Sequence, residues 1–135
     1  MPSHTFEDHP GEVRLRVRAT SLAGLFEEAA RGLAELMMEV ASPAGAEAAE
    51  NVELHARDRE ALLVAWLNEL IFLSETRRRV YTDVHVRRAS DTALEATIRG
   101  VFPETLRTAV KAATLHGLVV ENTPDGFVAS LVLDV

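Results

Sequence analysis

Side chains that could bind a metal ion gather near both ends of this chain of 135 residues. Four of them precede or begin the first clearly patterned strand: Glu7, Asp8, His9 and Glu12. At the other end, Asp134 precedes Val135. If the first and last strands are neighbours, Glu12 and Asp134 converge, with the terminal carboxylate of Val135 close by. Such hard oxygen donors suit Ca²⁺, Mg²⁺ or Mn²⁺ rather than a soft metal. The alternative is a set of ordinary scattered surface acids.

Motifs of the common enzyme classes are absent from the sequence. There is no glycine-rich phosphate loop, no zincin pair of histidine and glutamate, and no serine in a nucleophile elbow. The chain has no cysteine, which excludes a disulfide scaffold, a thiolate metal site and a cysteine nucleophile. We therefore expect a protein that is not an enzyme. The rival interpretation is a small metal-dependent hydrolase, with Asp8 or Glu12 as general base and a cation at Asp134.

Three further histidines have less distinctive surroundings. His55 and His85 fall on the polar faces of their predicted strands, so we expect them to be exposed. His116 precedes Gly117 in an apolar neighbourhood. It is either a packed, hydrogen-bonded histidine or part of a site, and the sequence pattern leaves both open.

The charge balance limits the partners. The chain has 21 acidic and 14 basic side chains, a net charge of −7. Strong direct nucleic-acid binding is disfavoured, because a domain that binds phosphates by itself usually carries net positive charge. One Trp and one Tyr also leave little material for stacking bases. An acidic balance fits a basic protein partner or a divalent cation.

The elements in the first half of the chain follow from hydrophobic periodicity. Strict alternation over 13–19 predicts a half-buried strand with arginines on its outer face. Thr20-Ser21 then caps an amphipathic helix that reaches Val40, and 41–49 is expected to be a surface loop. Alternation returns over 51–57 and predicts another strand.

The second half begins with a strongly apolar helix. Asp58 can cap it, it runs to about Glu75, and Trp66 should be buried because the helix is apolar on several sides. Two β-rich runs, 80–88 and 92–101, predict a hairpin. The segment 106–117 fits a helix or a strand equally well.

A strong turn signal, Thr123-Pro124-Asp125-Gly126, predicts a C-terminal hairpin. The element order β-α-β-α-β-β-β-β predicts an α+β fold, a two-layer sandwich with two helices packed on one mostly antiparallel sheet. Residues 1–135 form one domain of ordinary size. No apolar run approaches the length of about 20 residues that a membrane span needs, and the N-terminus lacks the features of a secretory signal, so we expect a cytoplasmic protein.

Taken in order, four stretches of the chain resemble the archease family. They are Phe6-Glu7-Asp8-His9 with Glu12-Val13; Ser21 to Leu33 with Leu36-Met37; Leu62 to Leu70, which contains Trp66-Leu67-Asn68-Glu69-Leu70; and Val110 to Leu118 with Leu133-Asp134-Val135. The resemblance covers nearly the whole chain. It implies a compact α/β sandwich that is not itself a catalyst, and it favours the extended interpretation of the segment ending at Leu118.

The resemblance also implies a function. Archeases assist RtcB-type RNA ligases in tRNA splicing and RNA repair, by promoting guanylylation of the ligase and its multiple turnover. They bind a divalent cation, which here implies Glu12, Asp134 and Val135 as ligands, with Ca²⁺ expected first and Mg²⁺ or Mn²⁺ as alternatives. The residues expected at the functional surface are Asp8, His9, Lys111 and His116. The remaining alternative is a metal-binding module with a different protein partner.

Three departures from the family pattern concern this same surface. The family usually reads Asp-His-Thr-Ala-Asp where this chain has Asp8-His9-Pro10-Gly11-Glu12. Ala109 stands where a Glu is usual, and Leu115 where a Tyr is usual. Glutamate can still bind a metal, but its longer side chain changes the reach of the site. We therefore expect a divergent family member.

Overall fold

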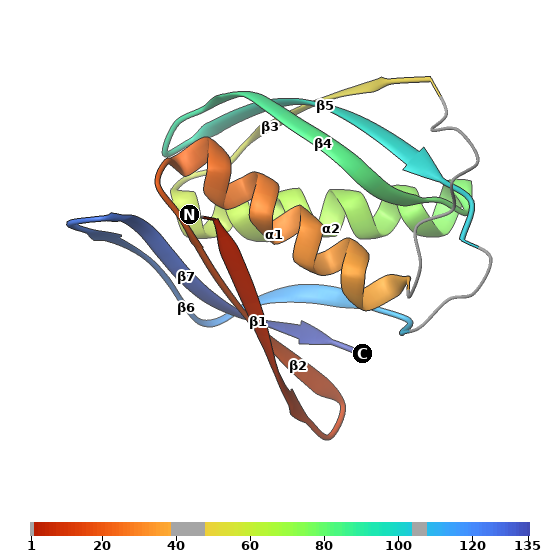
Figure 1. The fold of residues 1–135 in the computed structure, drawn as a ribbon, viewed down its shortest axis with the longest axis horizontal. Helices are drawn as coiled ribbons and strands as arrows, with labels where there is room; N and C mark the ends of the chain where they lie inside the picture. The colour runs from red at the N-terminus through yellow and green to blue at the C-terminus, as the bar shows by residue number, and fades with distance from the viewer. Residues whose placement is uncertain (1, 39–47, 104–107) are drawn as a thin grey trace.

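The computed structural model describes residues 2–38, 48–103 and 108–135. Figure 1 shows its two helices and its strands in chain order. The elements are β1 (Ser3–His9), β2 (Glu12–Ala19), α1 (Leu22–Met37), β3 (Glu50–His55), α2 (Arg59–Arg77), β4 (Val80–Ala89), β5 (Ala93–Val101), β6 (Ala112–Thr123) and β7 (Gly126–Asp134). The α+β class is confirmed, as are both predicted helices, the β4–β5 hairpin and the C-terminal hairpin.

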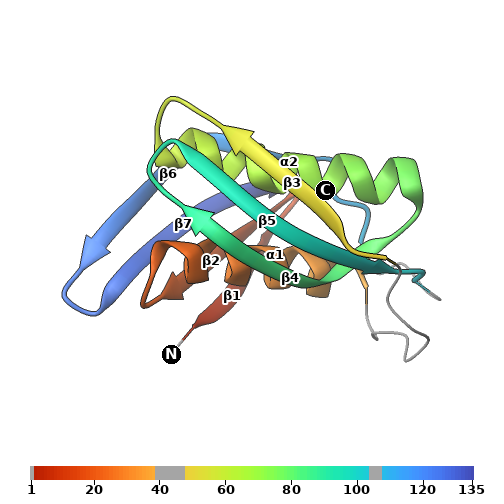
Figure 2. The same ribbon diagram turned by 90° about the horizontal axis from the view of Figure 1, so that it is seen from above.

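The strands form two antiparallel sheets with the helices between them (Figure 1). The four-stranded sheet has the order β1-β2-β7-β6 and the three-stranded sheet the order β3-β5-β4. From above, the three-stranded sheet crosses over both helices (Figure 2). The single sheet expected from the sequence is thus divided in two, because a helix layer that is apolar on both sides needs a cover on each side.

A strand that the sequence analysis did not predict, β1, begins the four-stranded sheet. It pairs antiparallel with β2 from Ser3 opposite Arg18 to His9 opposite Glu12. The acidic segment that was expected to approach the first strand is therefore itself the end of a strand. Its alternation is easily missed because Phe6 is the one hydrophobic residue that β1 packs against the core.

Both helices begin at the predicted capping residues. The Ser21 hydroxyl accepts a hydrogen bond from the Gly24 amide at 3.0 Å, and the Asp58 carboxylate accepts one from the Ala61 amide at 2.8 Å. These bonds satisfy amides of the first turn that have no partner within the helix. The first helix ends at Met37, and most of the loop expected after it lies outside the described residues.

The core lies around the helix layer, and Trp66 is at its centre as predicted. Its side chain is fully buried, and its indole N–H donates to the Phe26 carbonyl at 2.9 Å, which ties α2 to α1. Leu15 and Leu131 fill the core from the four-stranded sheet, and Ile98 from the three-stranded one. Both sheets therefore rest on one continuous core.

Side chains of α2 satisfy backbone groups of β6, the edge strand of the larger sheet. Asn68 bonds Ala113 twice: its amide oxygen accepts from the Ala113 N–H at 2.8 Å, and its amide nitrogen donates to the Ala113 carbonyl at 3.2 Å. Glu60 accepts from the Val120 amide at 2.7 Å, and Arg59 donates to the Val120 carbonyl at 2.9 Å. The helix thus takes the place of a neighbouring strand at these positions and blunts the exposed edge.

The ambiguous segment is a strand from Ala112 onward, and its described residues contain no helix. Residues 104–107 lie outside the described part, and β6 begins at Ala112. At the far end of β6 the chain turns through Gly126, whose φ is +139°. A Cβ atom there would lie 2.3 Å from the Ala19 carbonyl oxygen, so glycine is required for this close approach. Within the described residues, no helix is both long enough and apolar enough to cross a membrane.

Candidate metal and partner-binding site

The strand register brings the two predicted acidic ligands together. Glu12 on β2 is the cross-strand partner of Asp134 on β7, and it is also the partner of His9 on β1. Cross-strand partners point to the same face of a sheet. Val13, the next residue, is buried and alternates with Glu12; it lies on the same face as the core residue Leu15, so this row lies on the outer face. Asp8 is the cross-strand partner of Val13, so it lies at the same end of the sheet but on its other face. We call the group Asp8, His9, Glu12, Asp134 and Val135 the acidic corner.

Backbone hydrogen bonds hold the end of the chain beside the β1–β2 turn. The Val135 amide donates to the Gly11 carbonyl at 3.1 Å, and the Lys111 amide donates to the Asp134 carbonyl at 2.8 Å. The β1–β2 turn and the C-terminus therefore lie at one end of the sheet (Figure 1). A hollow at this end is lined by Phe6, Asp8, His9, Glu12, Val13, Glu35, Leu36, Thr108 and Val135.

The carboxylates of the corner have no cationic partner among the residues that the structure describes. Asp8 and Asp134 are exposed and Glu12 is half-buried, and none of the three forms an ion pair with a described residue. His9 is differently placed, because its Nε2 lies 3.1 Å from Glu7 Oε1. That hydrogen bond is the main reason that the pKa of Glu7 is below its usual value, and the positive charge of Arg16 is the next contribution.

The acidic corner supplies some, but not all, of the oxygen ligands that a hard divalent cation needs. Glu12 and Asp134 supply two side-chain carboxylates from neighbouring strands, and Ca²⁺ and Mg²⁺ take oxygen ligands of this kind. In the described ranges, no set of three His, Asp or Glu side chains is arranged to hold a metal ion. The other ligands would therefore have to be main-chain oxygens, for example at Val135, and water.

The two other predicted surface residues lie at different distances from the corner. Lys111 is exposed and directly precedes β6, where its amide binds the Asp134 carbonyl. His116 lies farther along the edge, in a bulge where Leu115 to Leu118 face only Leu131. It is exposed, so the packed, hydrogen-bonded alternative does not describe it. His55 and His85 are exposed as expected.

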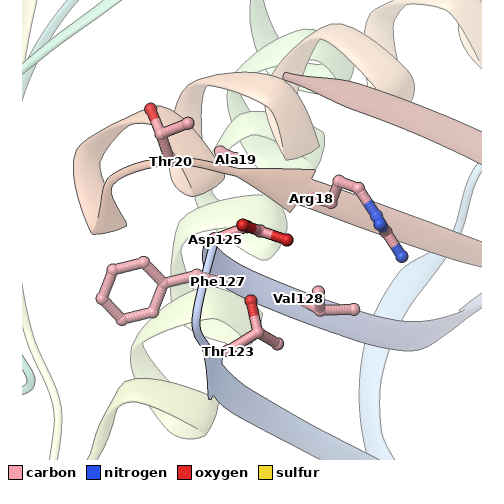
Figure 3. Close-up of a pocket in the computed structure, with 7 residues that line it drawn as sticks. All are labelled: Arg18, Ala19, Thr20, Thr123, Asp125, Phe127 and Val128. Carbon is pink, nitrogen blue, oxygen red and sulfur yellow. The ribbon is translucent and has the colours of Figure 1, made fainter. Parts of the chain in front are cut away.

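A second hollow lies at the opposite end of the same sheet. It is lined by Arg18, Ala19, Thr20, Thr123, Asp125, Phe127 and Val128. In Figure 3 the side chains of Arg18 and Phe127 extend in different directions. This hollow contains none of the residues predicted to bind a metal or a partner, so we assign the candidate site to the acidic corner.

Sequence reasoning missed two polar arrangements. Asn68 was noted only as part of a sequence motif, whereas the structure shows it bonded to the edge of β6. His4 was not singled out at all, yet both of its ring nitrogens bond carboxylates of α1. The available signal was the alternation of His4 and Phe6 within 3–9, which places both side chains on one face of an extended segment.

Comparisons with known proteins agree over the full length of the chain. The model of the Archease protein family matches residues 4–135. The protein archease of Archaeoglobus fulgidus is 33% identical over 98% of this chain and 98% of its own length. That of Methanosarcina acetivorans is 30% identical over the whole of both chains.

Solved structures agree with these matches. Protein 1598 of Methanobacterium thermoautotrophicum has a TM-score of 0.77 at 27% identity, covering 98% of each chain. An archease of Thermotoga maritima, described as a possible chaperone, has a TM-score of 0.67 at 20% identity over 96% of this chain and 94% of its own, a likeness of fold alone. The family match, the full-length relatives and the shared fold together lead to one conclusion: the chain belongs to the archease family.

Proposed function

We propose that this protein is a non-catalytic activator of an RtcB-type RNA ligase, which promotes guanylylation of the ligase and its multiple turnover in tRNA splicing or RNA repair. Membership of the archease family supports the proposal. The protein would act in the cytoplasm by binding the ligase rather than by binding RNA strongly itself. Its net charge of −7 supports that distinction.

The observation that carries the proposal is the like-charged pair of Glu12 and Asp134. Like charges directly opposite each other on neighbouring strands destabilise a sheet. These two carboxylates are opposite each other on the outer face, with no ion-pair partner among the described residues. A cost of this kind is expected where a cation or a basic partner surface compensates for it on binding.

A divalent cation would be held by Glu12, Asp134 and a main-chain oxygen of Val135, with Ca²⁺ expected before Mg²⁺ or Mn²⁺. When bound, the cation would neutralise the two carboxylates. Asp8 and His9 would extend the contact surface along the β1–β2 turn, while Lys111 and His116 would extend it along β6. A ligase that handles RNA ends presents basic surface, and complementary charge speeds the encounter of two proteins.

The test is covalent transfer of GMP to a cognate RtcB-type ligase, measured with and without this protein. Catalytic amounts of the protein should convert a single turnover into many. Asp8→Ala and Asp134→Ala should impair this conversion while the far-ultraviolet circular dichroism stays unchanged. Stimulation should weaken as salt rises, because exposed charges are screened.

The control variant is Glu53→Ala with Glu95→Ala, which removes a like-charged cross-strand pair from the other sheet. It should leave stimulation intact. If wild-type protein gives no stimulation, the ligase proposal fails. In that case, retained cation binding would favour a metal-binding module with another partner, and turnover of simple phosphoesters by the pure protein would favour a hydrolase.

A further inference from the structure

His4 joins the N-terminal strand to helix α1 through two carboxylates. Its Nδ1 lies 2.6 Å from Glu28 Oε2, and its Nε2 lies 2.6 Å from Glu35 Oε2. Glu28 is almost completely buried, at 6% exposure, and the His4 side chain is only 15% exposed. This arrangement lies on the inner face of the sheet, away from the row that contains Glu12 and Asp134.

Between two ionised carboxylates, the His4 ring makes both hydrogen bonds only when it is protonated. Ionised carboxylates only accept hydrogen bonds, so each ring nitrogen must carry a hydrogen to bond its partner. Both nitrogens carry hydrogen only in the imidazolium form. Burial by itself lowers the pKa of His4, but the hydrogen bonds and negative charges of Glu28 and Glu35 outweigh it and raise the pKa above its ordinary value.

The surrounding residues leave space for this ring and few other charges near it. A Cβ atom on Gly32 would lie 2.9 Å from Leu15 Cδ1 and 3.3 Å from the His4 ring, so a glycine at that turn of α1 leaves room for both side chains. On α1, Arg31 donates to the other oxygen of Glu28 at 2.9 Å. On β2, the cross-strand partner of His4 is the apolar Val17.

Among the residues that the structure describes, two arginines of β2 also lie beside His4. The outer-face side chains of Arg16 and Arg18 line a shallow hollow beside His4. Arg16 is paired with Glu7 at 2.9 Å. On β1 itself, the neighbour is the Phe6 ring, edge-on at 5.4 Å between centroids. The groups that bind the imidazolium directly are therefore the two glutamates of α1.

The contacts of His4 also reach the acidic corner. Phe6, which packs against the His4 ring, and Glu35, which binds its Nε2, both line the hollow that contains Asp8 and Glu12. The position of β1 on α1 therefore sets the shape of that hollow. A change in the bonding of His4 would therefore reach the hollow through Phe6 and Glu35, which contact His4 and also line the hollow.

We infer that protonated His4 is a latch that holds β1 against α1, and that the latch opens as pH rises and the imidazolium loses its proton. A neutral ring keeps one N–H, so one carboxylate then faces an unprotonated nitrogen and is repelled. Opening releases the outermost strand of the sheet and loosens the wall of the hollow at the acidic corner. The latch operates whether or not the protein activates a ligase.

The pH window follows from the direction of the pKa shift. Because the pKa of His4 is raised in the folded state, its stabilisation is fully present below the unfolded value of about 6.5 and is lost as pH rises through the folded value. The difference in melting temperature between wild type and His4→Gln should therefore be largest below about pH 6.5 and shrink as pH rises through the raised pKa of the folded state.

The test combines ring titration with local stability. NMR of the His4 ring should show titration above the ordinary value, and Glu35→Gln should lower that midpoint. Amide exchange, corrected for its intrinsic pH dependence, should lose protection in β1 but not in β5 as pH rises. Glu35→Gln keeps the test informative should His4→Gln fail to fold.

The matched control is the exposed pair of His55 and Glu53, whose atoms lie 3.2 Å apart. Glu53→Gln should leave the His4 midpoint and the protection of β1 unchanged. A His4 ring that titrates at or below its ordinary value overturns the latch. So does a loss of protection that spreads equally over both sheets, or a melting-temperature difference that is independent of pH.

Discussion

Each of the two sheets places a pair of carboxylates directly opposite each other on its outer face, but only one pair has partners. In the three-stranded sheet, Glu53 faces Glu95. Glu95 lies 3.5 Å from Arg88, and Glu53 lies 3.2 Å from His55. In the four-stranded sheet, Glu12 faces Asp134, and neither has an ion pair with any residue that the structure describes.

The difference separates an ordinary solvated surface from a candidate site. The outer face of the three-stranded sheet distributes its charges so that acids and bases lie side by side, as Asp83 and Arg99 also do at 3.9 Å. On the outer face of β2, acids and bases are instead separated along the strand: Glu12 lies at its start and the arginines follow it. An uncompensated pair at the end of a sheet, beside an open hollow, is therefore better evidence of a ligand than the total number of acids.

The largest effect should come from the core that both faces share. Trp66→Ala should destabilise the protein by about 3–5 kcal/mol, because it empties a large buried site and removes the indole hydrogen bond to the Phe26 carbonyl. Denaturant unfolding followed by far-ultraviolet circular dichroism measures this cost.

Phe72→Ala is the matched control for that variant, since Phe72 lies on the same helix and is 57% exposed. We expect it to change stability by no more than about 0.5 kcal/mol. Amide exchange in the Trp66 variant should show both sheets weakened together. If only one sheet loses protection, the two sheets do not rest on a common core, and their outer faces cannot be compared as parts of one cooperative unit.

The next effect distinguishes the two carboxylate pairs by their response to a cation. Ca²⁺ or Mn²⁺ should raise the melting temperature of the wild type, by the equivalent of about 2.7 kcal/mol at a hundred times the Kd. The double variant Glu12→Gln, Asp134→Asn should lose this response. The double variant Glu53→Gln, Glu95→Gln should keep it. An equal response in all three proteins would remove Glu12 and Asp134 from the cation site.

A smaller effect concerns how α2 supports the strand next to Asp134. Asn68→Ala should cost about 1–3 kcal/mol, because the amide and carbonyl of the buried residue Ala113 lose their partner. Asn68→Asp is a sharper variant, since a carboxylate accepts from the Ala113 amide but cannot donate to its carbonyl. Amide exchange should localise the loss to the start of β6. A loss confined to β5 would contradict this assignment.

Sequence reasoning was most successful where the cause is local. The hydroxyl of Ser21 and the carboxylate of Asp58 cap helices because of their own backbone neighbours, and the turn at Gly126 follows from its own sequence. The convergence of Glu12 and Asp134 could be stated only as a condition, that the first and last patterned strands are neighbours. The observed register meets that condition.

The features that escaped prediction depend on contacts between distant segments. The division into two sheets depends on what covers each side of the helix layer, and period-two patterns look the same in either sheet. Asn68 reads as one polar residue in an apolar helix until the edge of β6 lies against it. The exposure of His116 follows from a bulge opposite Leu131, and neither residue's own neighbours in sequence specify that register shift.

The smallest expected effect is the most direct test of the comparison. Without added divalent cation, Glu12→Gln should stabilise the protein by about 0.2–1 kcal/mol, because it removes one member of an uncompensated like-charged pair. Glu53→Gln should change stability little, since the gain from removing a charge opposite Glu95 is offset by the loss of the contact with His55. Rising salt should reduce the gain from Glu12→Gln, because screening already weakens the repulsion in the wild type. Paired denaturant titrations in chelator at low and high salt measure both differences. If Glu12→Gln instead destabilises the cation-free protein, Glu12 already has a favourable partner in the fold, and the acidic corner is a solvated surface like the face around Glu53 and Glu95.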